Sequence, residues 1–225
     1  MSLLRFDTAD APTNAQATAH LRITVKDPDP RKAGRRFCDA TMQLALGGYA
    51  GFHTTTPPST ASAYGVYWPA LVPRCRVEDV VVLPDGTSRV VEHPPSGPLP
   101  VLPTVNAVGE LTDEATERVP LGRLVGARSG DKGGNANVGL WARDDATWEW
   151  LAGSFTIERF RELLPEAAGL TVRRYELPRL RALNLVVVGL LGEGVASTTR
   201  PDPQAKGLGE YLRSRMIKVP VRLLR

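Results

Sequence analysis

The sequence predicts a mixed α/β (α+β) chain: a two-layer sandwich in the last hundred-odd residues, preceded by a smaller N-terminal α/β segment. Strand-like alternation and helical spacing of apolar residues follow one another along the chain, and strands followed by helices pack against one sheet face. A hydrophobic content of 42% in 225 residues is enough for one or two cores. A proline-rich run separates the two parts, so we expect three regions: residues 1–95, a linker at 96–117, and residues 118–225.

The N-terminal segment is expected to begin with a strand and a helix. Leu21, Ile23 and Val25 alternate with polar residues, which is the pattern of a half-buried strand. Asp29 and the proline after it are typical of a helix start, and apolar residues at helical spacing continue to Leu44. A pair of glycines then ends the predicted helix.

A loop and a hairpin are expected next. Residues 53–62 are rich in threonine and proline, which favours a long loop. Residues 80–83 read as a short buried strand, and the turn Pro84-Asp85-Gly86 predicts that residues 87–91 pair back with it.

The C-terminal region is expected to contain four strands and two helices. The predicted strands are residues 121–127, 136–141, 170–177 and 182–191. One helix carries apolar residues at Ile157, Phe160, Leu163 and Leu164, and the other begins at Asp202 and places Leu208 and Leu212 on one face.

The most distinctive feature is the run Arg128-Ser129-Gly130-Asp131-Lys132-Gly133-Gly134-Asn135-Ala136-Asn137, which we interpret as a glycine-rich loop. Glycines permit positive φ, so successive backbone N–H groups can point into one concavity, where basic side chains add charge. Such a loop can bind a phosphate or a carboxylate, and the expected ligand-binding residues are Arg128, Ser129, Gly130, Gly133, Gly134, Asn135 and Asn137. The alternative is a tight turn between strands, with an internal ion pair of Asp131 with Lys132 or Arg128.

Asp131, Lys132 and His53 are the candidate catalytic residues. His53 lies in a threonine-rich loop near an aromatic cluster at residues 64–68, which predicts a ligand pocket, although ordinary core aromatics give the same pattern. Ser129 and Lys132 have the Ser-x-x-Lys spacing of Ser/Lys acyl-enzymes, but the two glycines after Lys132 disfavour the helix which that spacing requires.

Several classes of site and location are not expected. The spacing around Gly130 does not fit a P-loop, and prolines after Gly194 prevent the helix that nicotinamide binding requires. No His, Cys and carboxylate cluster has metal-ligand spacing, so we expect no metal. The two cysteines are far apart, and neither a signal peptide nor an apolar run of about 20 residues is visible. We therefore expect a cytoplasmic protein that does not act at a membrane.

Charge is unevenly distributed along the chain. Residues 1–117 carry a net charge of −3 and residues 118–225 one of +7. A basic C-terminal half favours an anionic partner, such as a phosphate, a carboxylate or coenzyme A, although a solvated surface gives the same pattern. The basic residues are scattered with few aromatics among them, so nucleic acid is not expected.

The run at residues 128–133, with Asn135-Ala136-Asn137-Val138-Gly139, resembles the signature of the acyclic terpene utilisation protein A (AtuA) family. Further similar stretches are residues 34–37, 49–52, 57–58, 64–72, 191–195 and 202–210. The resemblance implies that residues 118–218 are the family's small C-terminal domain of ferredoxin-like fold. It also implies that residues 21–92 are the closing part of its large N-terminal α/β domain.

Family members are far longer, and most of the large domain is absent here. The resemblance therefore implies a fragment, a truncated reading frame, or one subunit of a split protein in which a separate chain carries the rest of the large domain. The family is associated with bacterial breakdown of acyclic terpenoids such as citronellol and geraniol, through coenzyme A thioesters. We therefore expect an enzyme or enzyme subunit that handles a branched acyl-CoA or carboxylate, with coenzyme A only as part of the substrate. The alternative is a non-catalytic module that completes a larger AtuA-like protein in trans. We also expect a homo-oligomer.

Overall fold

The computed structural model describes residues 1–44, 47–48, 52–92, 97 and 114–224. It contains two compact units, formed by residues 1–65 and residues 66–225. Most of the predicted linker at residues 96–117 lies outside the described residues. In the described part of the chain, no helix has the length and apolar character needed to cross a membrane.

The first unit contains a short antiparallel ribbon and a helix. Strand β1 (Ser2–Arg5) pairs with β2 (Ala19–Arg22), and α1 (Phe37–Gln43) follows a helical turn at Lys32–Arg36. The predicted helix is confirmed, but the prediction of a strand reaching Val25 is wrong. Because β1 has only four residues, the ladder has no partner for Ile23 or Val25.

A separate hairpin confirms one prediction and corrects another. Strands β3 (Asp79–Val82) and β4 (Ser88–Val91) are antiparallel and are joined by a turn in which Gly86 has a φ of +82°. The predicted pairing is therefore correct, whereas the predicted burial is not. Val80 is 50% exposed and Val82 is 68% exposed, because no other described element packs on this two-stranded ribbon.

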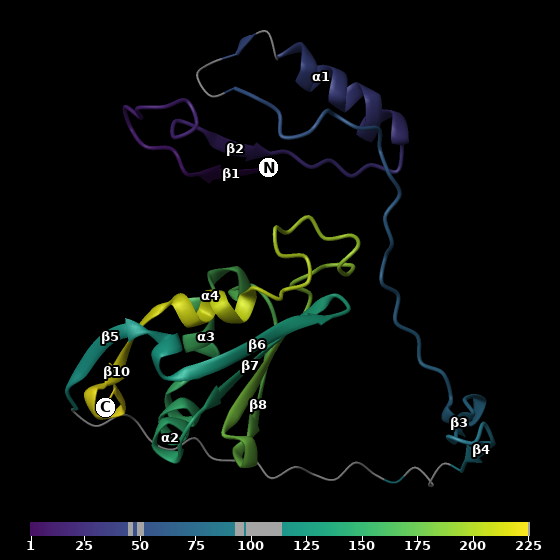
Figure 1. Cartoon of the computed structure of the whole chain (residues 1–225), viewed down its shortest axis with the longest axis vertical. Helices are drawn as coiled ribbons and strands as arrows, with labels where there is room; N and C mark the ends of the chain where they lie inside the picture. The colour runs from purple at the N-terminus through teal and green to yellow at the C-terminus, as the bar shows by residue number, and fades with distance from the viewer. Residues whose placement is uncertain (45–46, 49–51, 93–96, 98–113, 225) are drawn as a thin grey trace. The chain divides into compact units, whose positions relative to one another are not determined.

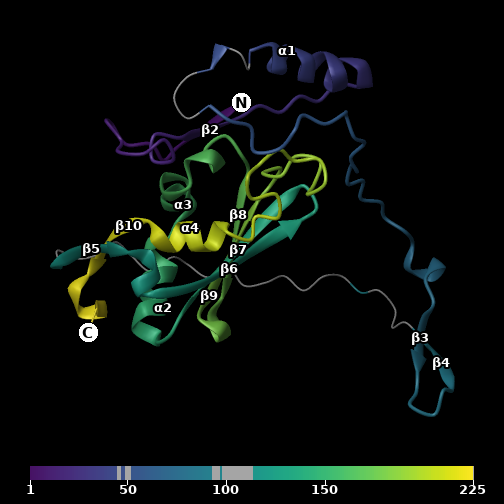
Figure 2. The same cartoon turned by 45° about the horizontal axis from the view of Figure 1, so that its top comes forward.

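The C-terminal part is a two-layer α+β sandwich, as predicted. Its four-stranded antiparallel sheet has the order β6-β7-β9-β8, and the helices lie to one side of that sheet (Figures 1 and 2). The strands are β6 (Val125–Lys132), β7 (Asn135–Ala142), β8 (Val172–Leu177) and β9 (Ala182–Val187). The helices are α2 (Asp145–Ser154), α3 (Ile157–Leu163) and α4 (Leu208–Ser214). A separate ribbon pairs β5 (Thr116–Pro120) with β10 (Met216–Pro220).

Several predicted boundaries in this part are wrong for local reasons. Leu121–Arg123 forms a single helical turn, so the first strand begins only at Val125. Helix α4 begins at Leu208 rather than near Asp202. The Asp202 carboxylate accepts hydrogen bonds of 3.0 Å from the N–H groups of Lys206 and Gly207, which close a turn before the helix.

Alternation along the strands gives the sheet two different faces. On β7, Ala136, Val138 and Leu140 are fully buried against the helices, and β9 has the same pattern. The intervening residues form the opposite side, which we call the outer face, and helices α2, α3 and α4 do not cover it. It consists of Gly126, Arg128, Gly130 and Lys132 on β6; Asn135, Asn137, Gly139 and Trp141 on β7; Arg173, Tyr175 and Leu177 on β8; and Ala182, Asn184 and Val186 on β9.

Candidate functional site

The predicted glycine-rich loop is a β-hairpin, which corrects our interpretation of residues 128–137. Strand β6 continues to Lys132, which pairs with Asn135, so only Gly133 and Gly134 form the turn. Gly133 has a φ of +64° and Gly134 does not have a positive φ, the pattern of a type II′ turn. Strand geometry points successive N–H groups to opposite sides of β6, so they do not converge in the concavity that a loop would form.

Two polar side chains of the run brace the hairpin against distant segments. The buried Ser129 Oγ accepts a hydrogen bond of 2.8 Å from the Gly209 N–H and donates one of 3.2 Å to the Lys206 carbonyl oxygen. These bonds attach β6 to the start of α4. The Asn135 Oδ1 accepts a hydrogen bond of 2.9 Å from the Gly189 N–H. Both residues, predicted to bind ligand, thus have clear structural roles.

The turn glycines are required by close packing. A Cβ on Gly133 would overlap the ring of Tyr67, and a Cβ on Gly134 would overlap the carbonyl oxygen of Gly192. The Gly134 carbonyl oxygen also accepts a hydrogen bond of 2.9 Å from the Leu191 N–H. A larger residue would displace the backbone of Gly192 at position 134, and at position 133 it would displace the Tyr67 ring and be strained by the positive φ.

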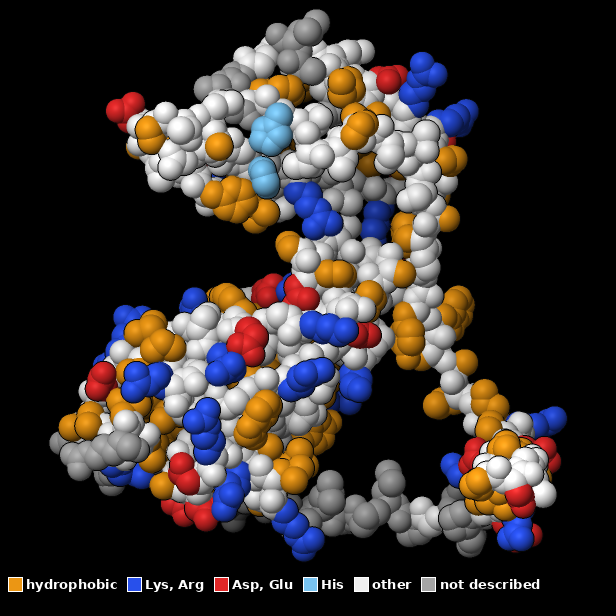
Figure 3. Space-filling model, viewed as in Figure 1, with side chains coloured by type: hydrophobic (Ala, Val, Ile, Leu, Met, Phe, Trp, Pro, Cys, Tyr) orange, Lys and Arg blue, Asp and Glu red, His pale blue; other side chains and the backbone are white. Residues whose placement is uncertain are grey.

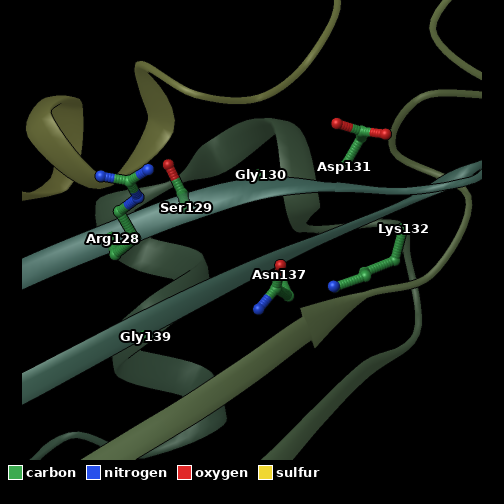
Figure 4. Close-up of a pocket in the computed structure, with 7 residues that line it drawn as sticks. All are labelled: Arg128, Ser129, Gly130, Asp131, Lys132, Asn137 and Gly139. Atoms are coloured by element: carbon green, nitrogen blue, oxygen red, sulfur yellow. The ribbon is translucent and has the colours of Figure 1, made fainter. Parts of the chain in front are cut away.

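The remaining residues of the run surround a shallow hollow of about 320 Å³ (Figure 4). It is lined by Arg128, Ser129, Gly130, Asp131, Lys132, Asn137 and Gly139. Gly130 and Gly139 give it a floor of backbone, and a Cβ on Gly130 would meet no other atom within 4 Å. The Asn137 Nδ2 donates a hydrogen bond of 3.1 Å to Asn184 Oδ1, which leaves its own carbonyl oxygen as an acceptor.

The charged residues at the hollow do not neutralise one another. Asp131 points away from Lys132 and Asn137, across strand β6 (Figure 4). Among the described residues, neither Arg128 nor Lys132 forms an ion pair with Asp131. The alternative interpretation was a tight turn between strands with an ion pair of Asp131 with Lys132 or Arg128. The turn is present, but among the described residues this ion pair is not. Two exposed cations remain on the outer face beside the glycine floor.

The candidate catalytic residues belong to two different units of the chain. Ser129 and Lys132 lie on opposite sides of β6, so their spacing does not produce a Ser–Lys pair. His53 belongs to the first unit, where its ring centroid is 6.1 Å from that of His20. Catalytic roles for His53, Asp131 and Lys132 stay predictions.

The sequence reasoning missed a second hollow and the aromatic residues of the outer face. The second hollow, of about 190 Å³, is lined by Trp150, Ser154, Phe155, Arg159, Ile217 and Lys218. In the described part of the chain, the buried Nε1 of Trp150 has no hydrogen-bond partner. On the outer face, Trp141 and Tyr175 are 42% and 45% exposed. Alternation of polar and apolar residues along the predicted strand at 136–141 was the signal that could have placed Trp141 there.

Basic side chains and possible metal ligands are both dispersed in the described part of the chain. Lys and Arg side chains are spread over the visible face of the C-terminal part rather than gathered in a stripe (Figure 3). No group of three or more His, Cys, Asp and Glu side chains in the described ranges is arranged to hold a metal ion.

Comparison with protein-family models gives two matches. The model described as AtuA ferredoxin-like domain matches residues 119–218. The model described as acyclic terpene utilisation family protein AtuA matches residues 1–83. Comparison with curated proteins and with solved structures gives no match.

Proposed function

We propose that this chain, which belongs to the acyclic terpene utilisation family AtuA and has its ferredoxin-like domain at the C-terminus, binds the anionic group of a terpenoid intermediate through the β6–β7 hairpin. Family membership indicates a part in acyclic terpene utilisation. The proposed ligand is a branched carboxylate or acyl-CoA, and the chain acts as an enzyme or enzyme subunit on it.

The observation that carries this proposal is the pair of exposed cations beside a floor without side chains. Arg128 and Lys132 extend from the outer face on either side of Gly130, and the chain offers no carboxylate partner there among the described residues. Hydrogen bonds between such cations and a carboxylate or phosphate are stronger than those between neutral groups. The backbone floor allows an anion to approach closely without displacing a side chain.

The geometry favours binding over proton transfer at the hairpin itself. Asp131 also lines the hollow, but its carboxylate points away from Lys132, across strand β6. The hollow is also shallow, whereas sites that enclose a whole organic ligand are concave and apolar. We therefore assign the hairpin the role of anchoring the anionic end of the ligand.

The test is calorimetric titration of the full chain with citronellate and with its coenzyme A thioester. Lys132→Ala and Arg128→Ala should each weaken binding roughly 10- to 150-fold, since a hydrogen bond to a charged group contributes about 1.5–3 kcal/mol. Lys218→Ala is the matched control, because Lys218 is an exposed lysine on β10 outside this hollow. Absence of binding by the wild type, or equal losses in all three variants, would refute the proposal.

The alternative function is a non-catalytic module that completes a larger AtuA-like protein in trans. One observation favours it: Trp141, Tyr175 and Leu177 are each more than 40% exposed on the outer face. Exposed apolar groups of this kind often mark a surface that another protein covers. Size-exclusion chromatography with light scattering distinguishes the two functions, because a monomer that binds the anion supports the first.

A further inference from the structure

The outer face contains an aromatic ring that the sheet supports from below. Trp141 pairs with Gly126 across β6 and β7, and a Cβ on Gly126 would overlap carbons Cε2 and Cζ2 of the indole. The ring therefore covers Gly126, and the glycine is what allows it to lie there. With Trp141 still 42% exposed, a flat aromatic surface faces solvent at a fixed position.

The cations follow this ring in a line along the hairpin. The outward residues of β6 and β7 face one another in cross-strand pairs. Going toward the turn, the pairs are Gly126 with Trp141, Arg128 with Gly139, and Gly130 with Asn137. Lys132 with Asn135 comes last. Outward residues on one strand are about 7 Å apart, so Arg128 and Gly139 lie one such step from the ring and Gly130 lies two steps from it.

The charge of the outer face is of one sign. The outward positions of the four strands include Arg128, Lys132 and Arg173, and none of them is Asp or Glu. Two amides, Asn137 and Asn184, lie between the cations and are joined by a hydrogen bond of 3.1 Å. The face is thus complementary to a ligand with several negative charges and polar edges.

From this arrangement we infer that the outer face binds a purine nucleotide, with the base stacked on Trp141 and the phosphates between Arg128 and Lys132. This inference rests on the proposed anion binding and names the chemistry of the anion. A hydrocarbon chain needs concave apolar walls, which this open face lacks, whereas a base stacks on one flat ring and keeps its edges in water. One ribose spans the step between the ring and Arg128.

The nucleotide has two possible sources, which share a base and phosphates: a free adenine nucleotide, or the nucleotide end of coenzyme A. Adenosine 3′,5′-bisphosphate, coenzyme A and 4′-phosphopantetheine, which lacks the base, separate them. We expect the first two to bind the full chain in calorimetry and to quench its tryptophan fluorescence. Tighter binding of coenzyme A than of the bisphosphate would identify coenzyme A as the ligand. Equal affinity for the two compounds would identify the free nucleotide as the ligand.

Trp141→Leu tests the stacking directly. Stacking of one base on an aromatic side chain predicts a loss of roughly 5- to 150-fold in affinity for both nucleotides, together with loss of the quenching. Trp68→Leu is the matched control, since Trp68 is 88% exposed and lies outside the outer face, and it should change neither readout. Circular dichroism of both variants should remain that of the wild type.

Three outcomes would overturn the inference. The first is nucleotide binding that Trp141→Leu leaves unchanged, and the second is phosphopantetheine binding as tightly as coenzyme A. The third is a dimer in light scattering that Trp141→Leu dissociates and nucleotide does not, because a second copy would then cover the face. If citronellate still binds in a Lys132-dependent manner in any of these cases, the proposed anion site stands and only the nucleotide assignment fails.

Discussion

Two glycines of the same hairpin are expected to respond in opposite ways to the same substitution. In Gly134→Ala the new Cβ overlaps the carbonyl oxygen of Gly192, and both partners are backbone, so neither can move aside by rotating a side chain. Overpacking of this kind costs about 1–3 kcal/mol or more, and we expect the upper end here. In Gly130→Ala the new Cβ meets no atom within 4 Å, and φ is not positive. A compatible Gly→Ala change stabilises by about 0.4–1 kcal/mol through the unfolded chain.

Thermal unfolding monitored by circular dichroism distinguishes the two variants. For a chain of this length, 1 kcal/mol shifts Tm by about 2–4 °C, so Gly134→Ala should lower Tm by roughly 6–12 °C. Gly130→Ala should raise Tm by roughly 1–4 °C and yet weaken citronellate binding, because its methyl group occupies the floor of the hollow. Equal destabilisation by both variants would show that Gly130 is also held by packing. The reasoning that separates the site from the scaffold would then be wrong.

Three further substitutions test the scaffold, each by denaturant unfolding. Ser129→Ala should lower the free energy of unfolding by about 1–3 kcal/mol, since the buried Gly209 N–H loses its acceptor, and no loss would contradict this role. Asp144→Ala should cost about 1 kcal/mol as a lost N-cap of α2. The Thr147 N–H lowers the pKa of the Asp144 carboxyl, so the stabilisation of the wild type is present above about pH 4 and disappears as pH falls through the lowered folded-state pKa. Arg174→Lys should cost about 2 kcal/mol, because one ammonium cannot replace the guanidinium bonds to two carbonyl oxygens at the end of α2; stability equal to the wild type would refute that.

Strand β7 could be predicted from the sequence, whereas the end of β6 could not. In β7, Ala136, Val138 and Leu140 alternate with polar residues and glycine, so the pattern alone predicts a half-buried strand. The end of β6 contains glycine, aspartate and lysine, which are all depleted in strands, and the sequence therefore predicted a loop. Pairing with β7 and the bond from Ser129 to a residue 80 positions away overcome that local preference.

Helix α2 was missed although its start signal is present. Asp144 accepts a hydrogen bond of 2.8 Å from the Thr147 N–H, and an aspartate three residues before a threonine in an apolar run is an ordinary N-cap. The buried Thr147, Trp150 and Leu151 lie on one helical face, but one of them is polar and the apolar Trp148 lies on another face, so the apolar pattern alone does not mark a helix. Tertiary packing of α2 on β7, rather than periodicity, stabilises this helix.

Residues 128–132 form part of a strand and not a loop, so the side chains of the AtuA-like run point to two opposite sides. A loop would give each residue an individual role, but a strand divides them by alternation into two sets. On β6, Val125 and Ser129 face the helices and stabilise the fold, whereas Arg128, Gly130 and Lys132 face outward, on the side that α2, α3 and α4 do not cover. Substitutions should therefore affect stability at odd positions from 125 to 129 and ligand binding at even positions from 128 to 132. A run of ten residues can thus specify a scaffold and a binding surface at once, because the two requirements fall on opposite sides of one hairpin.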